Sequence, residues 1–149
     1  MKKIAVVLLA IMLLSLSGSS YKEVTRYNYF YKGESALWTA EYAVTGTGTW
    51  TEENNRLHYG NDIKEVLTVT YKNDVSELSG VNNLKIEYDY GGSGGSLNEY
   101  YDSSNPLTKR TIIMRGGGKN ISVPLKDSTV QVKVALDNNV QSLELKPAN

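Results

Sequence analysis

Apolar and polar residues alternate with a period of two along several stretches of the chain. The clearest runs place an apolar side chain at every second position, in segments 38–44, 67–71, 84–90 and 130–136. Because successive side chains of a β-strand point to opposite faces, this period predicts half-buried strands. β-Branched and aromatic residues fill the runs, as pleated surfaces favour. Beyond residue 20, no stretch keeps the spacing of an amphipathic helix for three turns.

Glycine, asparagine and aspartate clusters separate the predicted strands. Asp137-Asn138-Asn139 and Asn54-Asn55 tolerate positive φ angles and are expected to close hairpins. Gly46-Thr47-Gly48 is expected to separate two strands, and the glycine-rich segments 91–96 and 116–118 are expected to be loops. We therefore predict eight or nine strands, drawn from segments 24–31, 36–45, 48–53, 56–60, 65–71, 83–90, 97–101, 108–114, 129–136 and 140–145.

Many short antiparallel strands with frequent turns predict an all-β fold. An immunoglobulin-like antiparallel β-sandwich is the preferred architecture, because the strands are irregularly spaced and Trp38 lies on an early strand, where such sandwiches often bury an aromatic ring. The antibody cystine is absent, since the chain has no Cys. A small up-and-down barrel is the alternative, because the chain length fits one. Residues 20–149 are expected to form this single domain.

The first 19 residues have the order of a secretory signal peptide. Lys2 and Lys3 precede an apolar run from Ile4 to Leu16, and small residues follow. The run, an expected helix, is shorter than the roughly 20 residues that a transmembrane helix needs. We therefore expect the protein to be secreted or associated with the cell envelope. Membrane contact is expected only if this segment stays uncut.

Leu16-Ser17-Gly18 resembles the lipobox that ends the leaders of bacterial lipoproteins. In a lipobox the next residue is the Cys that carries the lipid, but here it is Ser19, which has no thiol. The resemblance implies a lipoprotein-like leader without its anchor, cut instead by the general signal peptidase.

Residues 31–38 read Tyr-Lys-Gly-Glu-Ser-Ala-Leu-Trp. This segment resembles the Tyr-x-Gly-Glu-Ser-x-x-Trp segment of small, mostly uncharacterised exported proteins and lipoproteins of Gram-positive bacteria. The resemblance implies an exported sandwich and transfers no catalytic residue. The residues themselves give a structural interpretation, in which Gly33 permits a turn and Trp38 fills the core.

Composition narrows the classes of function. With 16 Lys and Arg against 16 Asp and Glu, the chain has no positive excess for nucleic acid. The absence of Cys excludes disulfides, thiolate metal sites and cysteine nucleophiles. No motif places a nucleophile beside the single histidine, His58, so a catalytic triad is not expected. We expect no enzyme activity, no cofactor and no metal site.

Acidic and glycine-rich segments offer weaker signals. Glu52, Glu53 and Asp102 leave open a glycosidase-type carboxylate pair, whose geometry the sequence does not define. Residues 52–55 could supply calcium ligands but lack the Asp-x-Asp regularity, so a solvated loop is the better interpretation. Segment 116–120 lacks the spacing of a phosphate-binding loop.

Eleven tyrosines supply the best binding candidates. Tyr27, Tyr29 and Tyr31 share one face of the first strand and could stack on sugar rings, with Tyr100 and Tyr101 as further candidates. The other interpretation is that these rings close the edge of the core. Segment 27–31 also has the Tyr-x-x-x-Tyr spacing of haem-capturing sandwich domains of Gram-positive surfaces, where it lies on a late strand.

The sequence thus predicts an exported, non-catalytic binding or structural module of the bacterial cell envelope. The expected partner is a cell-wall glycan or an envelope protein. The first alternative is a carbohydrate-binding module that uses exposed tyrosines. The second is a secreted hydrolase or an inhibitor of one, which a deep pocket with a perturbed carboxylate or with His58 would favour.

Overall fold

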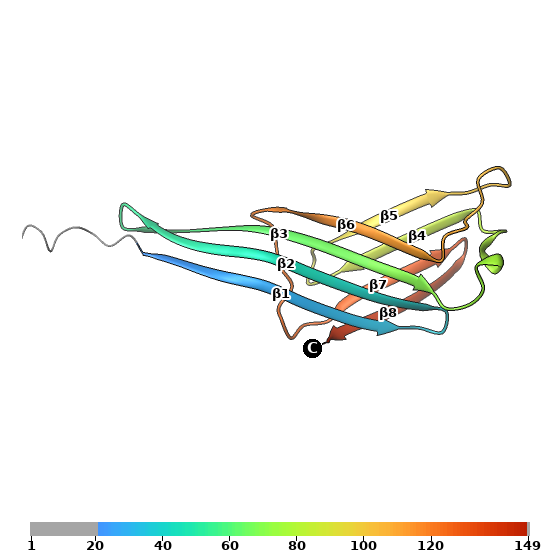
Figure 1. The fold of residues 1–149 in the computed structure, drawn as a ribbon, viewed down its shortest axis with the longest axis horizontal. Helices are drawn as coiled ribbons and strands as arrows, with labels where there is room; N and C mark the ends of the chain where they lie inside the picture. Colours follow the sequence, from blue (N-terminus) through green and yellow to red (C-terminus); the bar gives the residue numbers. More distant parts are fainter. Residues whose placement is uncertain (1–20, 149) are drawn as a thin grey trace, which may run out of the picture.

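The computed structural model describes residues 21–148, which form antiparallel β-strands and one short 3-10 helix (Figure 1). The strands are β1 (Lys22–Glu34), β2 (Trp38–Glu53), β3 (Arg56–Tyr71), β4 (Asn83–Asp89), β5 (Gly94–Tyr100), β6 (Thr111–Lys119), β7 (Val130–Leu136) and β8 (Asn139–Pro147). The 3-10 helix η1 (Val75–Leu78) lies between β3 and β4. The predicted all-β antiparallel class is confirmed. The predicted signal peptide and its lipobox-like end lie outside the described residues.

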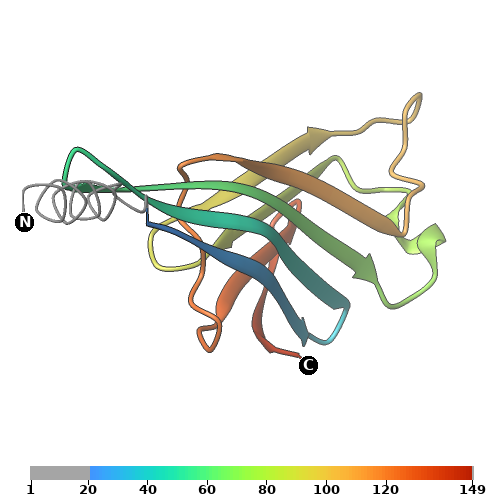
Figure 2. The ribbon, with the colours of Figure 1, turned by 60° about the vertical axis from the view of Figure 1, so that its left-hand side comes forward.

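The strands form a single sheet in the order β5-β4-β7-β8-β1-β2-β3-β6, nearly closed into a barrel. Its two halves are joined where β1 and β8 pair, and only Tyr31–Pro147 and Lys32–Lys146 make this ladder. On the opposite side β5 and β6 are the two edges of the sheet (Figures 1 and 2). The architecture therefore has features of both predicted alternatives, with two facing halves and a barrel-like curl.

The core lies inside the curled sheet, and the apolar side chains of the alternating runs form it, as predicted. Trp38 is 1% exposed and packs against Tyr71 with ring centroids 5.0 Å apart, which confirms that it fills the core. β5 and β6 contribute no fully buried side chain; their inward residues Leu97, Ile112 and Met114 are only partly buried. The core is therefore least complete along the side where the barrel is open.

Several predicted turns, interruptions and loops are wrong, because the glycines concerned lie within strands. Gly33, predicted to permit a turn, lies inside β1, and the predicted loop 91–96 is shorter because β5 begins at Gly94. Gly46 and Gly48 belong to β2, which is continuous from 38 to 53, and β3 runs unbroken from 56 to 71. Segment 116–118 belongs to β6 and pairs with β3. A Cβ atom at Gly46 or Gly117 would lie 2.2 Å from a backbone oxygen of β3. These glycines allow close approach of neighbouring strands.

The predicted asparagine turns are confirmed. Asn54 and Asn55 have φ angles of 52° and 59° and close the β2–β3 hairpin. Asp137, with a φ angle of 50°, begins the turn between β7 and β8. Such positive angles suit Asn and Asp better than most residues, which explains why composition located these turns.

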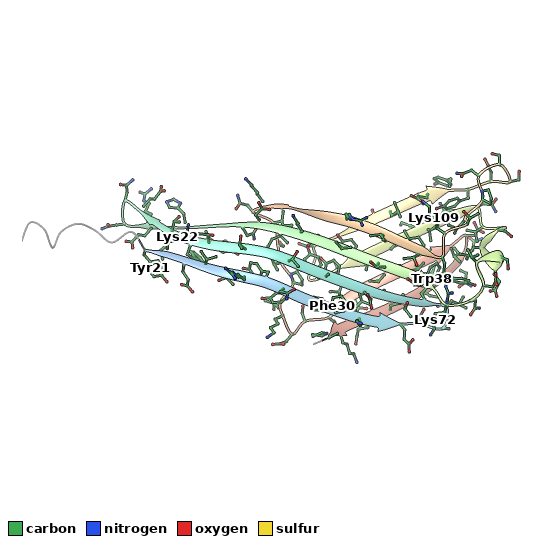
Figure 3. The ribbon with its side chains drawn as sticks, in the orientation of Figure 1. Tyr21, Lys22, Phe30, Trp38, Lys72 and Lys109 are labelled. Carbon is green, nitrogen blue, oxygen red and sulfur yellow. The ribbon has the colours of Figure 1, made fainter. Side chains whose placement is uncertain are left out.

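The first three strands extend beyond the rest of the sheet as a single-layered projection (Figure 1). β6 accompanies β3 only to Asp62, and β8 pairs with β1 only at Tyr31 and Lys32. Residues 21–27 and 48–61 thus form a three-stranded extension, which we call the blade. Tyr21 lies at its tip (Figure 3), where its carbonyl accepts a hydrogen bond from Glu52 N at 3.2 Å. None of the helical segments within residues 21–148 is long and apolar enough to span a membrane.

Candidate functional site

A groove of about 980 Å³ lies between the two sheet edges. It is lined by residues of β5, by residues of β6 and by the segment that connects the two strands. The lining residues are Ser96, Leu97, Glu99, Tyr100, Tyr101, Asn105–Lys109 and Thr111–Arg115. Five consecutive residues of β6, Thr111–Arg115, line the groove, so main-chain atoms as well as side chains are available to a ligand.

Pairing with β3 determines which main-chain groups of β6 are free. Tyr71 N donates to Arg110 O at 2.9 Å, and Asn120 N donates to Asn61 O at 2.9 Å. Both pairs follow the register of the β3–β6 ladder. In an antiparallel ladder, hydrogen-bonded pairs alternate with pairs whose N–H and C=O groups point away from the partner strand. Every second residue of β6, counted from Arg110, therefore bonds to β3.

This alternation divides β6 into two sets. Ile112 and Met114 exchange hydrogen bonds with β3 and direct their side chains toward the core. The residues whose N–H and C=O groups face the open edge are Thr111, Ile113 and Arg115.

The same reasoning applies to β5. Tyr90 N donates to Ser93 O at 2.7 Å, and Tyr101 N donates to Asn82 O at 2.8 Å, both in the register of the β4–β5 ladder. Residues 95, 97 and 99 therefore bond to β4. The residues whose N–H and C=O groups face the open edge are Ser96, Asn98 and Tyr100.

The two edges carry some charged residues but lack other devices that commonly protect a sheet edge. Neither strand contains proline, and Ile113 on β6 is an apolar side chain that is 46% exposed. Proteins usually block exposed edges with proline, bulges, charges or a covering segment, because free edges pair with other chains. Within residues 21–148, no strand ladder joins β5 to β6. The groove is therefore bordered by two edges that can each accept another strand.

The charged side chains of the groove give it a positive balance. Lys109, in the segment before β6 (Figure 3), and Arg115 both line the groove and form no ion pair with any residue of the described chain. Glu99 instead accepts a hydrogen bond from the hydroxyl of Tyr101. Burial and the neighbouring Glu99 raise the pKa of Tyr101 to about 12. The two uncompensated cations favour an acidic group on a ligand.

Two of the five predicted site tyrosines lie at this groove. Tyr100 is 75% exposed and lies on its wall, and Tyr101 is half-buried beside it. The remaining three lie on β1, in a different part of the sheet. The structure therefore does not assemble the five tyrosines into one surface.

Exposure falls along the β1 row from the blade toward the barrel. Tyr27 and Tyr29 are half-buried, with ring centroids 5.7 Å apart in an edge-to-face arrangement. Tyr31 is fully buried, and its hydroxyl donates to Leu125 O at 3.0 Å. Tyr31 is therefore a core residue that cannot stack on a ligand. Its bonded hydroxyl also does not match the haem-ligand role that the Tyr-x-x-x-Tyr spacing implied.

The sequence did not predict a carboxylate inside the barrel. Glu65 on β3 is 6% exposed and accepts hydrogen bonds from Tyr90 Oη at 2.6 Å and from Tyr88 Oη at 3.3 Å. The ring of Tyr42 packs 5.3 Å from that of Tyr88, and its buried hydroxyl has no hydrogen-bond partner among the described residues. This cluster links β2, β3, β4 and the turn after β4.

The electrostatics of this cluster follow from its burial. Desolvation and the adjacent carboxylate of Glu65 raise the pKa of Tyr88 to about 12, and they raise those of Tyr42 and Tyr90 further. Two phenol hydroxyls donate hydrogen bonds to the Glu65 carboxylate, which forms no ion pair with any described residue. A glycine-rich pocket of about 490 Å³ borders Glu65, Tyr88 and Tyr90. The cluster is a buried hydrogen-bonded network, and the pocket beside it gives a small polar ligand access to these side chains.

The remaining acidic candidates and the histidine do not converge. Glu52, Glu53 and His58 are exposed at the blade. Asp102 lies in the segment after β5, where its carboxylate accepts hydrogen bonds from Ser104 and Asn105 that lower its pKa. In the described part of the chain, no three His, Asp or Glu side chains form a group that could hold a metal ion.

Comparison of the chain with protein-family models, with curated proteins and with solved structures found no match. A function for the protein is therefore inferred from its sequence and from the geometry of residues 21–148.

Proposed function

We propose that the protein is an exported, non-catalytic binding module of the bacterial cell envelope, which takes an extended peptide strand into the groove between β5 and β6. The leader-like sequence of residues 1–19 supports export. The observation that carries the binding proposal is the pair of unpaired sheet edges that line one groove. An extended peptide can add to such an edge through main-chain hydrogen bonds, which supply affinity.

The walls of the groove indicate the sequence of the peptide. The inward face offers partly buried apolar side chains at Leu97, Ile112 and Met114, where apolar residues of an added strand would extend the core. The outward face carries Lys109 and Arg115, which favour an acidic residue. Because side chains alternate along a strand, the fitting peptide has apolar residues at every second position and acidic residues between them. An exposed segment of an envelope protein is the source we propose.

Substitution at Ile113 tests strand addition. Ile113→Pro removes an N–H that faces the groove and leaves the bonds from β6 to β3 in place, as proline on a sheet edge allows. We expect its affinity for a fluorescent peptide of alternating valine and glutamate to fall roughly tenfold, through loss of main-chain hydrogen bonding and steric conflict with the proline ring.

The matched control is Ile113→Ala, which keeps the N–H and should bind within about twofold of the original, since only one half-exposed side chain changes. Fluorescence anisotropy gives the affinities, and thermal melting establishes that both variants are folded. Equal affinity of the two variants, or no binding of the peptide by the original protein, would contradict strand addition.

A cell-wall glycan is the second candidate, favoured by the exposed ring of Tyr100 on the groove wall. Tyr100→Ala should then weaken glycan binding by about 1 kcal/mol or more. Ile113→Pro should leave it unchanged, because sugar stacking does not use the edge N–H. Sedimentation with purified cell walls, at low and high salt, measures this binding.

A further inference from the structure

The two faces of the blade differ in chemistry. Residues directly opposite one another in an antiparallel ladder place their side chains on the same face. By this criterion one face carries large apolar and aromatic side chains, from Tyr21, Tyr27, Trp50, Leu57 and Tyr59. The carboxylates of Glu23 and Glu52 lie on the same face, near the tip. The opposite face carries mostly polar side chains, among them Lys22, Arg26, Thr47, Thr49, Thr51 and His58, with Val24 as its one large apolar residue.

The aromatic face is ordered by its own contacts. The rings of Trp50 and Tyr59 lie 4.8 Å apart, and the hydroxyls of Tyr27 and Tyr59 are hydrogen-bonded at 2.6 Å. A Cβ atom at Gly48 would lie 2.5 Å from the hydroxyl oxygen of Tyr59, so glycine leaves space for the rings to lie across β2. The result is a continuous group of contacting aromatic rings on one face of the blade.

This surface is not covered by any described part of the chain. Trp50 is 40% exposed, Tyr59 41% and Leu57 62%. Four of the ten exposed large hydrophobic residues of the described chain lie on this face of the blade, a small part of the molecule. A concentrated apolar patch of this kind marks an interaction surface.

The position of the blade indicates what the surface meets. Tyr21 at the tip follows the apolar run that ends at Leu16 after only four small residues. At roughly 3.4 Å per residue, these five chain steps span at most about 17 Å. A chain that keeps this run in a bilayer therefore holds the blade tip at the bilayer surface. Trp and Tyr are the residues enriched at that level of a membrane.

The charged residues near the tip are divided between the two faces of the blade. Lys22, Arg26 and Arg56 lie on the opposite face with Glu53, whereas Glu23 and Glu52 lie on the aromatic face. The aromatic face therefore offers no cation to anionic headgroups, and apolar contact must supply the affinity. This predicts binding to bilayers of zwitterionic lipid that does not depend on salt.

We propose that the aromatic face of the blade binds the interfacial region of a lipid bilayer, while the barrel and its groove extend away from the membrane. This contact is additional to any membrane contact of the apolar segment 4–16. It does not depend on what binds between β5 and β6.

Trp50 offers a direct probe. The other tryptophan, Trp38, is 1% exposed and inaccessible to lipid. All buried core residues lie between Tyr31 and Leu145, so a chain of residues 20–149 keeps the whole core and lacks the apolar segment. With phosphatidylcholine vesicles that carry brominated acyl chains, we expect a blue shift and partial quenching of tryptophan fluorescence, unchanged at 1 M salt. Thermal melting of the same sample establishes that it is folded.

Two matched variants locate the contact. Leu57→Ser, on the aromatic face, should lower the vesicle partition coefficient roughly fivefold or more, because an exposed leucine loses its contact with lipid. Val24→Ser, on the opposite face of the same blade, should leave it within about twofold.

Three results would overturn the proposal. These are no quenching at millimolar lipid, equal loss in both variants, and protein-concentration-dependent dimers that protect Trp50 without lipid. Binding to purified cell walls in place of vesicles would assign the surface to glycan instead. Because Ile113 lies outside the blade, vesicle binding of Ile113→Pro should equal that of the original protein, which separates this proposal from strand addition.

Discussion

The barrel and the blade share the long strands β1, β2 and β3, but the same type of side chain is buried in the barrel and exposed on the blade. β2 carries Trp38 in the barrel, where it is 1% exposed, and Trp50 on the blade, where it is 40% exposed. Both residues lie on the core-side face of the strand, since their positions differ by an even number. What differs is the second half of the sheet, which faces Trp38 and does not extend as far as Trp50. Local alternation therefore defines a face, and the rest of the fold decides whether that face becomes core or surface.

The largest expected difference between the two regions is in thermal stability after an apolar residue is replaced by aspartate. Val132→Asp should unfold the protein, because Val132 is fully buried and has no partner for a carboxylate. Leu57→Asp on the blade should leave the melting temperature almost unchanged, because the carboxylate remains in water. Circular dichroism during heating measures both. A cooperative transition near the original temperature for Val132→Asp would contradict the assigned core.

The second effect compares the two tryptophans. Trp38→Ala should lower the free energy of unfolding by about 3 to 5 kcal/mol, because it leaves a large cavity in the core. Trp50→Ala should lower it by about 1 kcal/mol or less, because the side chain is already partly in water. Urea unfolding gives both values. Similar losses would show that the blade is as tightly packed as the barrel.

A smaller effect separates the buried tyrosines from the exposed ones at alkaline pH. The pKa of Tyr88 is raised to about 12, and those of Tyr42 and Tyr90 are raised further, above the usual value near 10. A raised folded-state pKa stabilises the fold fully below pH 10, and this stabilisation is lost as pH rises through 10 toward 12. Tyrosinate absorbance should therefore appear in two stages, the later one coinciding with loss of circular dichroism. A single reversible stage near pH 10, with the fold intact, is the contrary result.

The elements that the sequence predicted well are those defined by local alternation. Segments 38–44, 67–71 and 130–134 bury the side chains that the period of two assigns to the core, and Leu136 is partly buried. Glycine was a poorer guide, because the same residue permits a turn at Gly91 and close strand approach at Gly46. Composition cannot distinguish these roles, since the difference depends on the neighbouring strand.

The candidate sites were less predictable than the strands. Tyr100 and Tyr101 were identified from sequence, but the groove beside them depends on which strands end the sheet, and strand order is a non-local property. Trp50 and Tyr59 were missed because their alternation resembles that of any half-buried strand. Glu65 follows the same alternation among apolar neighbours, and this polar residue at a core position was the available signal for the buried network.

Amide hydrogen exchange along β6 tests the strand-addition account most directly. Ile112 and Met114 bond to β3, and their amides should exchange slowly with or without peptide. The amides of Ile113 and Arg115 face the groove, so they should exchange rapidly in the free protein and become protected when the alternating valine–glutamate peptide is added. Slow exchange at Ile113 in the free protein would mean that the barrel is already closed. Rapid exchange that persists with saturating peptide would mean that no strand is added there.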